Sequence, residues 1–122
     1  MSPSELLEIS QLAWANGIGT YAIFLTISGG YLVAAYSAGR SLTRAQYLLA
    51  NGLFLVLATS TVLAVTAFFT AALRHADRAA RLDPEFAQLA SPYAIAAVTA
   101  VNLFVVVACL KFMRDVRTPG AE

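Results

Sequence analysis

Charge is what this sequence has least of, and the places where it is missing decide most of the interpretation. Charged residues make up 12% of the 122-residue chain and hydrophobic residues 59%, whereas soluble domains average about 25% and roughly 45–50%. A domain this small hides only about 60–70% of its chain surface on folding, so it could not enclose so many apolar side chains. The composition therefore favours a chain that places its apolar side chains in a lipid bilayer.

Three long segments carry no Asp, Glu, Lys or Arg: residues 9–39, 45–73 and 86–110. A helix needs about 20 mostly apolar residues to cross about 30 Å of hydrocarbon, and each segment is long enough. Backbone groups in lipid must pair internally, and the sequence lacks the alternating segments of about 10 residues that form a barrel. We therefore predict an all-α integral membrane protein: a single domain over 1–122 with three transmembrane helices in a small bundle.

Capping signals place the helix boundaries. Ser2 with Glu5, and Thr43 with Gln46, have the spacing of capping boxes. Aspartate and serine precede the prolines of the later segments, as N-caps do, and Gly39 suits a left-handed residue that ends a helix. The predicted helices cover about 3–38, 44–81 and 92–114, with a connector at 82–91 that includes a short extramembrane helix over 84–90.

The second predicted helix is longer than a bilayer is thick. About 38 residues at about 1.5 Å each extend about 57 Å, so its last turns, from Arg74 to Arg81, are predicted to project into water. Asp77 and Arg81 stand four residues apart and would form an acid–base pair there. The arm from Arg74 to Ala90 is either a solvated connector or a docking site for a soluble partner.

Lys and Arg are unevenly divided between the two ends of the predicted spans, with five on one side and three, diluted by acids, on the other. Because basic residues favour cytoplasmic loops, we expect the N-terminus outside and the C-terminus in the cytoplasm. Seven arginines against one lysine, with abundant alanine, suggest a GC-rich bacterial genome and hence a bacterial inner membrane. The layout resembles that of small three-span bacterial inner-membrane proteins, a resemblance of topology that transfers no functional residue.

Residues that carry chemistry are scarce. A single cysteine, Cys109, excludes an intramolecular disulfide, and a single histidine, His75, is too little to hold haem or a metal. The predicted spans contain none of the Asp, Glu, His, Lys or Arg side chains that coupled transporters use, and no catalytic motif is present. With a net charge of +1 and no basic run, nucleic-acid binding has no support. We expect no enzyme activity, no cofactor, no metal site and no coupled transport.

A layer of small polar residues is predicted at mid-depth. The spans have their midpoints near Leu25, Ser60 and Asn102, which puts Thr26, Thr59, Ser60 and Asn102 near one plane. An unpaired amide in hydrocarbon is costly, so we expect Asn102 to hydrogen-bond to a neighbouring helix. The layer serves helix packing or, in a second interpretation, lines a permeation or ligand site.

Small residues recur at steps of four along the first predicted helix. The positions are Thr26, Gly30, Ala34 and Ala38, together with Ala13 before Gly17 and Ala15 before Gly19. Such spacing lets helix backbones approach closely. This surface therefore packs either inside the three-helix bundle or against another membrane-embedded chain.

Together these features predict a small structural or accessory membrane subunit that lies in the lipid bilayer and acts through helix–helix association. Its partner would be a second copy, giving a homo-oligomer, or another membrane protein. The alternative is a passive channel or transport component formed by oligomerisation, with Thr59, Thr66 and Thr70 as a polar stripe on the second helix. Lipid or quinone binding between helices is a third interpretation, which rests on no specific residue.

Overall fold

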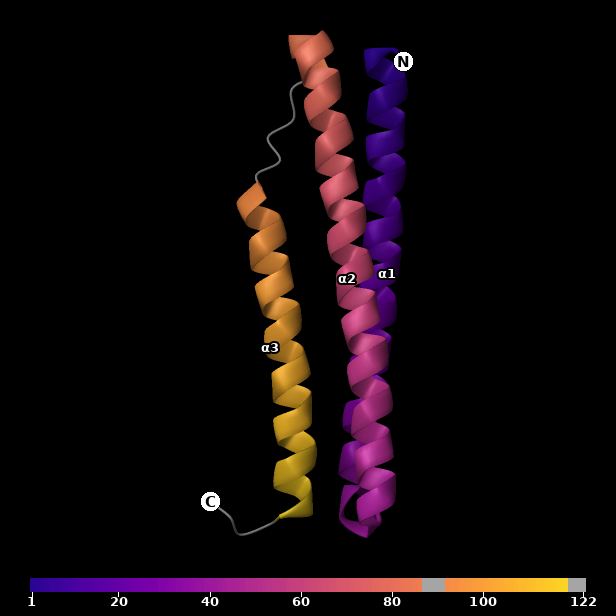
Figure 1. Ribbon diagram of the computed structural model, residues 1–122, viewed down its shortest axis with the longest axis vertical. Coiled ribbons are helices and arrows are strands. Elements are labelled where there is room, and N and C mark those ends of the chain that lie inside the picture. Colours follow the sequence, from indigo (N-terminus) through magenta and orange to yellow (C-terminus); the bar gives the residue numbers. More distant parts are fainter. Residues whose placement is uncertain (87–91, 119–122) are drawn as a thin grey trace.

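Three long helices lie side by side in the computed structural model, which describes residues 1–86 and 92–118. They are α1 (Pro3–Ala38), α2 (Arg44–Leu82) and α3 (Pro92–Arg117), with two short 3-10 turns, η1 (Gly39–Ser41) and η2 (Pro84–Phe86), after the first two. Helix α2 runs antiparallel to α1 and α3 (Figure 1). All regular structure in the described residues is helical, which confirms the predicted all-α class.

Both predicted capping boxes are present. The Ser2 hydroxyl accepts from the Glu5 backbone N–H at 3.2 Å, and the Glu5 carboxylate accepts from the Ser2 N–H at 2.7 Å. Thr43 and Gln46 make the same reciprocal pair at 3.2 and 2.9 Å. These contacts satisfy backbone donors that have no partner within the helix, and so fix where α1 and α2 begin.

Helix α1 ends at Ala38 and α3 begins at Pro92, as predicted, but other details of the helix ends differ from the sequence expectations. Gly39 is right-handed, with φ −54° and ψ −38°, because the chain continues directly into η1. A Cβ at Gly39 would lie 3.1 Å from Cγ1 of Val116, so its small size serves the approach of α3. Helix α3 continues to Arg117, past the predicted end at 114. The predicted helix over 84–90 is a 3-10 turn at Pro84–Phe86, and its remainder lies outside the described residues.

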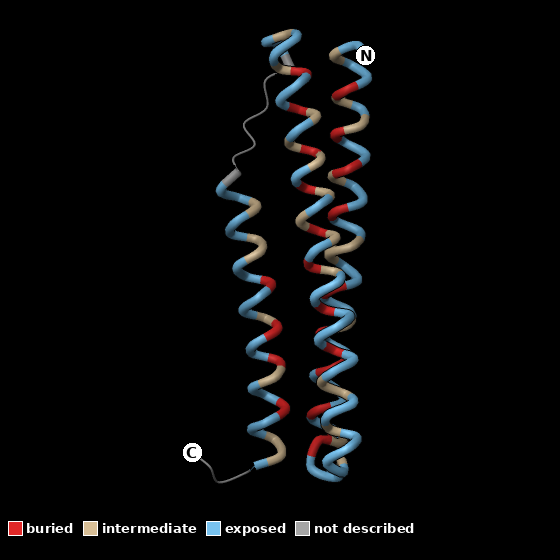
Figure 2. Tube along the Cα trace, in the orientation of Figure 1, coloured by how far each residue is buried: buried red, intermediate tan, exposed pale blue. Residues whose placement is uncertain are grey.

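Helices α1 and α2 form a continuous contact along most of their length (Figure 2). The buried residues of α2 follow steps of three and four: Phe54, Ala58, Val62, Val65, Phe69, Ala72, Ala76 and Ala79. This spacing averages close to 3.5 residues, which keeps one strip of side chains facing the same partner helix. Half of these residues are alanine, so the two backbones can approach closely.

Helix α3 packs against a shorter part of this pair. It begins below the level at which α2 ends, so the start of α1 and the end of α2 extend past it (Figure 1). The shared apolar core draws three residues from each helix: Phe24, Tyr31, Ala35, Phe54, Ala58, Val62, Val106, Cys109 and Met113. The three-helix core therefore lies toward the C-terminal end of α3.

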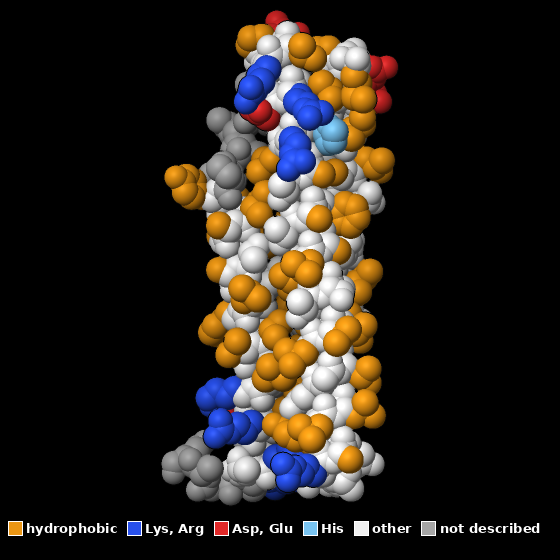
Figure 3. Space-filling model, in the orientation of Figure 1, with side chains coloured by type: hydrophobic (Ala, Val, Ile, Leu, Met, Phe, Trp, Pro, Cys, Tyr) orange, Lys and Arg blue, Asp and Glu red, His pale blue; other side chains and the backbone are white. Residues whose placement is uncertain are grey.

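All three helices are long and apolar enough to cross a membrane, with mean hydropathies of 1.5, 2.1 and 2.3 in sequence order. Only 22%, 28% and 17% of their most apolar windows is buried inside the chain, so internal packing leaves most of this surface uncovered. On the face shown in Figure 3, Lys and Arg gather at the two ends and are absent from the belt between them. These features suggest a multi-pass membrane protein.

Candidate functional site

The residues predicted as a polar layer or packing face differ in their burial. Asn102 is buried, whereas the other five are exposed: Thr26, Gly30, Ala34, Thr59 and Ser60. Two of the exposed hydroxyls bond to their own helices, from Thr26 to the Ala22 carbonyl at 2.9 Å and from Ser60 to the Val56 carbonyl at 2.7 Å. Such bonds to the preceding turn satisfy a hydroxyl without a second helix.

Asn102 does not make the predicted bond to a neighbouring helix. It is only 1% exposed, and neither its amide oxygen nor its nitrogen has a hydrogen-bond partner among the described residues. The polar residues expected beside it on α2, Thr59 and Ser60, lie on the exposed surface of that helix and do not bond to it. The polar link between α2 and α3 is instead formed by the Thr66 and Thr99 hydroxyls, whose oxygens are 3.2 Å apart.

Two further hydrogen bonds join α1 to α2. The buried Ser10 hydroxyl donates to the Ala72 carbonyl at 2.8 Å, and the Tyr31 hydroxyl donates to Oδ1 of Asn51 at 2.6 Å. The Tyr31 ring also stacks on Phe54, with centroids 4.1 Å apart. Neither bond was predicted from the sequence, although Ser10, Gly17, Phe24 and Tyr31 recur every seven residues and so mark one face of α1.

Gly17 of α1 lies directly against the Phe69 side chain of α2. A Cβ at this position would lie 2.4 Å from Cε1 of Phe69, a distance that no real side chain could keep. The Phe69 ring also contacts Trp14, with ring centroids 4.7 Å apart. Together with buried Ser10 and Ala13, Gly17 forms what we call the inner face of α1.

A second set of small residues on α1 is exposed in the described part of the chain. We call it the outer face, and its exposed members, at steps of three and four, are Ala15, Gly19, Ala22, Thr26, Gly30 and Ala34. A Cβ at Gly19 or Gly30 would meet no atom within 4 Å. The predicted face at Thr26, Gly30 and Ala34 therefore does not pack inside the three-helix arrangement, because α2 and α3 occupy the other side of α1.

Arg117 joins the end of α3 to the turn between α1 and α2. Its Nη1 donates to the carbonyls of Gly39 and Leu42 at 3.1 and 2.8 Å, and its guanidinium lies 4.4 Å from the centre of the Tyr47 ring. The last turn of α1 has no basic residue of its own, so Arg117 supplies the cation that favours a helix C-terminus. No local pattern could have shown this contact, which joins residues 78 positions apart.

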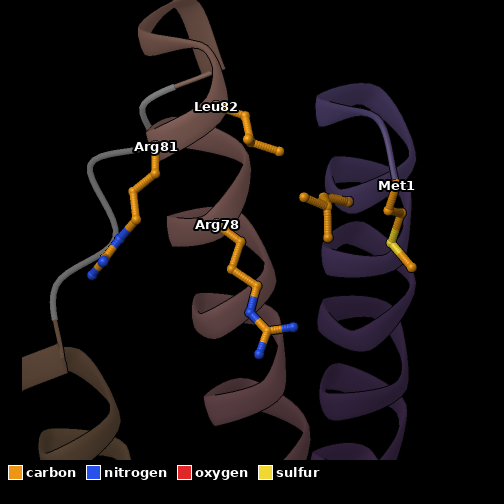
Figure 4. A pocket seen from close by; sticks show the side chains of 5 residues that line it. Met1, Arg78, Arg81 and Leu82 are labelled. Carbon is orange, nitrogen blue, oxygen red and sulfur yellow. The ribbon is translucent and has the colours of Figure 1, made fainter.

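The opposite end holds ion pairing and a small cavity. Asp77 and Arg81 form the predicted pair, with Nε and Oδ2 3.0 Å apart. A cavity of about 370 Å³ lies between the start of α1 and the end of α2, with Leu82 directed toward α1 and Arg81 directed away from it (Figure 4). Its lining is mainly apolar, and the described ranges contain no group of three metal-ligating side chains.

No protein-family model, curated protein or solved structure matches the chain. What residues 1–86 and 92–118 define is a class of protein: three long apolar helices in the pattern of a multi-pass membrane protein. Within the described residues, α1 also carries a small-residue surface that the other helices leave exposed.

Proposed function

We propose that this chain is a small structural or accessory subunit of a bacterial inner membrane, and that it acts by helix–helix association. The observation that carries the proposal is the exposed outer face of α1. Lipid tails are as apolar as leucine, so helices in a bilayer associate through close packing and hydrogen bonds, and small residues provide the close packing. A second copy of the chain is the partner to test first, and another membrane protein is the second.

The inner face of α1 shows how such a contact works in this chain. At Gly17 the absence of a Cβ lets the Phe69 ring lie directly against the helix backbone. Gly30 offers the same absence of a side chain, and beyond its own stretch of helix no atom of the described residues lies within 4 Å of the vacant Cβ position. A helix from a second copy can therefore approach the outer face as closely as α2 approaches the inner face.

The helix lengths support a particular placement in the bilayer. The charge-free part of α3, residues 92–110, extends about 29 Å, which matches the hydrocarbon thickness. The 39 residues of α2 extend about 58 Å, so in this placement its end from Arg74 onward projects into water. The excess of basic residues at the other end favours a cytoplasmic C-terminus and an outside N-terminus. Labelling of single cysteines at Arg40 and Asp83 from either side of the membrane tests this orientation.

Energy transfer between donor- and acceptor-labelled copies in lipid vesicles tests the association directly. Wild-type chains should show transfer that falls when unlabelled protein is added, and Gly30→Leu should reduce it because the new side chain holds the helices apart. Gly52→Leu on α2 is the matched control, since Gly52 is also exposed with no atom within 4 Å of its Cβ position. Wild-type chains that show no transfer, and capture no membrane partner, would contradict the proposal.

A passive channel or transport component formed by oligomerisation is the second candidate function. It is favoured by the exposure of Thr59 and Thr70, two hydroxyl residues of the predicted polar stripe on α2. Thr66, the third member, is engaged with Thr99 inside the chain and so contributes less to a polar path. Flux of ions or small neutral solutes through reconstituted protein would support this function, and the absence of flux at high protein density would exclude it.

A further inference from the structure

A groove of about 420 Å³ lies between α2 and α3 near the end of the molecule where α3 terminates. Its α2 wall is formed by Tyr47, Asn51 and Leu55, which stand four residues apart and so share one helix face. Helix α3 forms the other wall with Val107, Leu110, Lys111 and Arg114. The groove is separate from the outer face of α1, because none of its lining residues belongs to that helix.

The groove changes from polar to apolar along its length. Arg114 and Lys111 line one end, where α3 approaches its C-terminus, and Val107 lies seven residues before Arg114, about 10 Å along the helix. Val107 and Leu55, which line the apolar end, are 64% and 40% exposed, so hydrocarbon from outside the chain can reach them. Cationic groups followed by an exposed apolar channel match the order of parts in a phospholipid, a headgroup followed by an acyl chain.

Arg114 is the cation that remains available at the polar end. Lys111 forms an ion pair with Asp115 at 2.5 Å, and Arg117 is engaged with two carbonyls and the Tyr47 ring. Arg114 makes no ion pair within the part of the chain that the structure describes. Even with the Asp115 carboxylate counted, this end of α3 carries an excess of positive charge, which favours an anion.

We propose that this groove binds one anionic phospholipid, such as phosphatidylglycerol, with its phosphate at Arg114 and an acyl chain along Val107 and Leu55. Basic pockets between membrane helices bind anionic headgroups because low local polarity strengthens the attraction. Asn51 adds a donor, since its Oδ1 accepts from Tyr31 and its amide N–H groups remain free. The inference needs the membrane placement proposed above but does not need association through the outer face.

Native mass spectrometry of the full chain in mild detergent tests this, with phosphatidylglycerol and phosphatidylcholine of the same chain length as probes. Wild-type protein should retain one phosphatidylglycerol in preference to phosphatidylcholine. Arg114→Gln should lower that preference about fivefold, the loss expected for one cation near an anionic headgroup. Arg44→Gln is the matched control, because it removes the same charge from the start of α2 outside the groove. Equal losses in both variants would show general surface attraction and overturn the proposal.

The apolar half of the groove is tested by Val107→Trp, at a position exposed enough to accept the larger ring without repacking the core. Filling the groove should reduce phosphatidylglycerol retention while circular dichroism shows unchanged helix content. Retention at the wild-type level would show that no acyl chain lies along Val107. Competition by soluble glycerol 3-phosphate as effective as competition by phosphatidylglycerol would show a free-anion site. Either result would contradict a lipid site. Energy transfer between copies should be unchanged in both variants, so a failure here is distinct from a failure of the association proposal.

Discussion

The two small-residue faces of α1 look alike in sequence and differ completely in their surroundings. The inner face meets α2, where Phe69 lies against Gly17 and the Ala72 carbonyl accepts from Ser10. The outer face, which includes Gly30, is exposed, and a Cβ at Gly19 or Gly30 would meet nothing else in the described chain. Spacing of small residues therefore marks where a helix can be approached closely, and the residues on the opposing helix decide whether the approach occurs within one chain.

Leucine substitution at one glycine of each face should give the largest difference in stability between the two faces. Gly17→Leu places a side chain where Phe69 already lies, and we expect the free energy of unfolding to fall by about 1–3 kcal/mol, the usual cost of overpacking. Gly19→Leu enters open space and should leave the unfolding of a single chain nearly unchanged. Denaturant titration of helix content in mixed micelles measures both, and equal losses would show that the two faces are packed alike.

Arg117→Gln should weaken the attachment of α3 without changing the association of copies through the outer face. The variant loses the charged hydrogen bonds to Gly39 and Leu42 and the contact with Tyr47, so we expect a loss of about 1–2 kcal/mol. The same titration measures this loss, and energy transfer between copies should remain at the wild-type level. A variant that kept its stability would show that these contacts contribute nothing to holding α3.

Asn102→Leu should act in the opposite direction. The buried amide has no partner among the described residues, and replacing it by an apolar side chain of similar size removes an unsatisfied group. We expect a gain of about 1 kcal/mol in the free energy of unfolding. A large loss of stability would mean that Asn102 makes a polar contact essential to the fold.

Ser10→Ala should have the smallest effect. Interhelical hydrogen bonds in membranes average about 0.6 kcal/mol, so losing the bond to the Ala72 carbonyl should cost about that much. Thr26→Ala on the outer face is its control, because the Thr26 hydroxyl bonds only to its own helix. In the same titration, Thr26→Ala should keep a higher free energy of unfolding than Ser10→Ala. The reverse order would contradict the assignment of Ser10 to the inner face and Thr26 to the outer face.

The helix starts could be predicted from sequence because their causes are local. Ser2 and Glu5, like Thr43 and Gln46, stand only three residues apart along the chain. Which side of a helix is covered depends instead on residues far away, so neither the exposure of Gly30 nor the unpaired state of Asn102 could be derived from spacing. The seven-residue recurrence from Ser10 to Tyr31 was the available signal for the inner face.

Disulfide crosslinking between copies at Ala34 tests most directly whether the outer face is an interface. In a Cys109→Ala background, Ala34→Cys places a thiol on the outer face, and Ala108→Cys places one on the exposed surface of α3 as a control. In vesicles under mild oxidation, we expect rapid dimer formation through Ala34→Cys and slow, concentration-dependent crosslinking through Ala108→Cys. Equal slow rates at both positions, with no membrane partner captured at Ala34→Cys, would contradict association through the outer face.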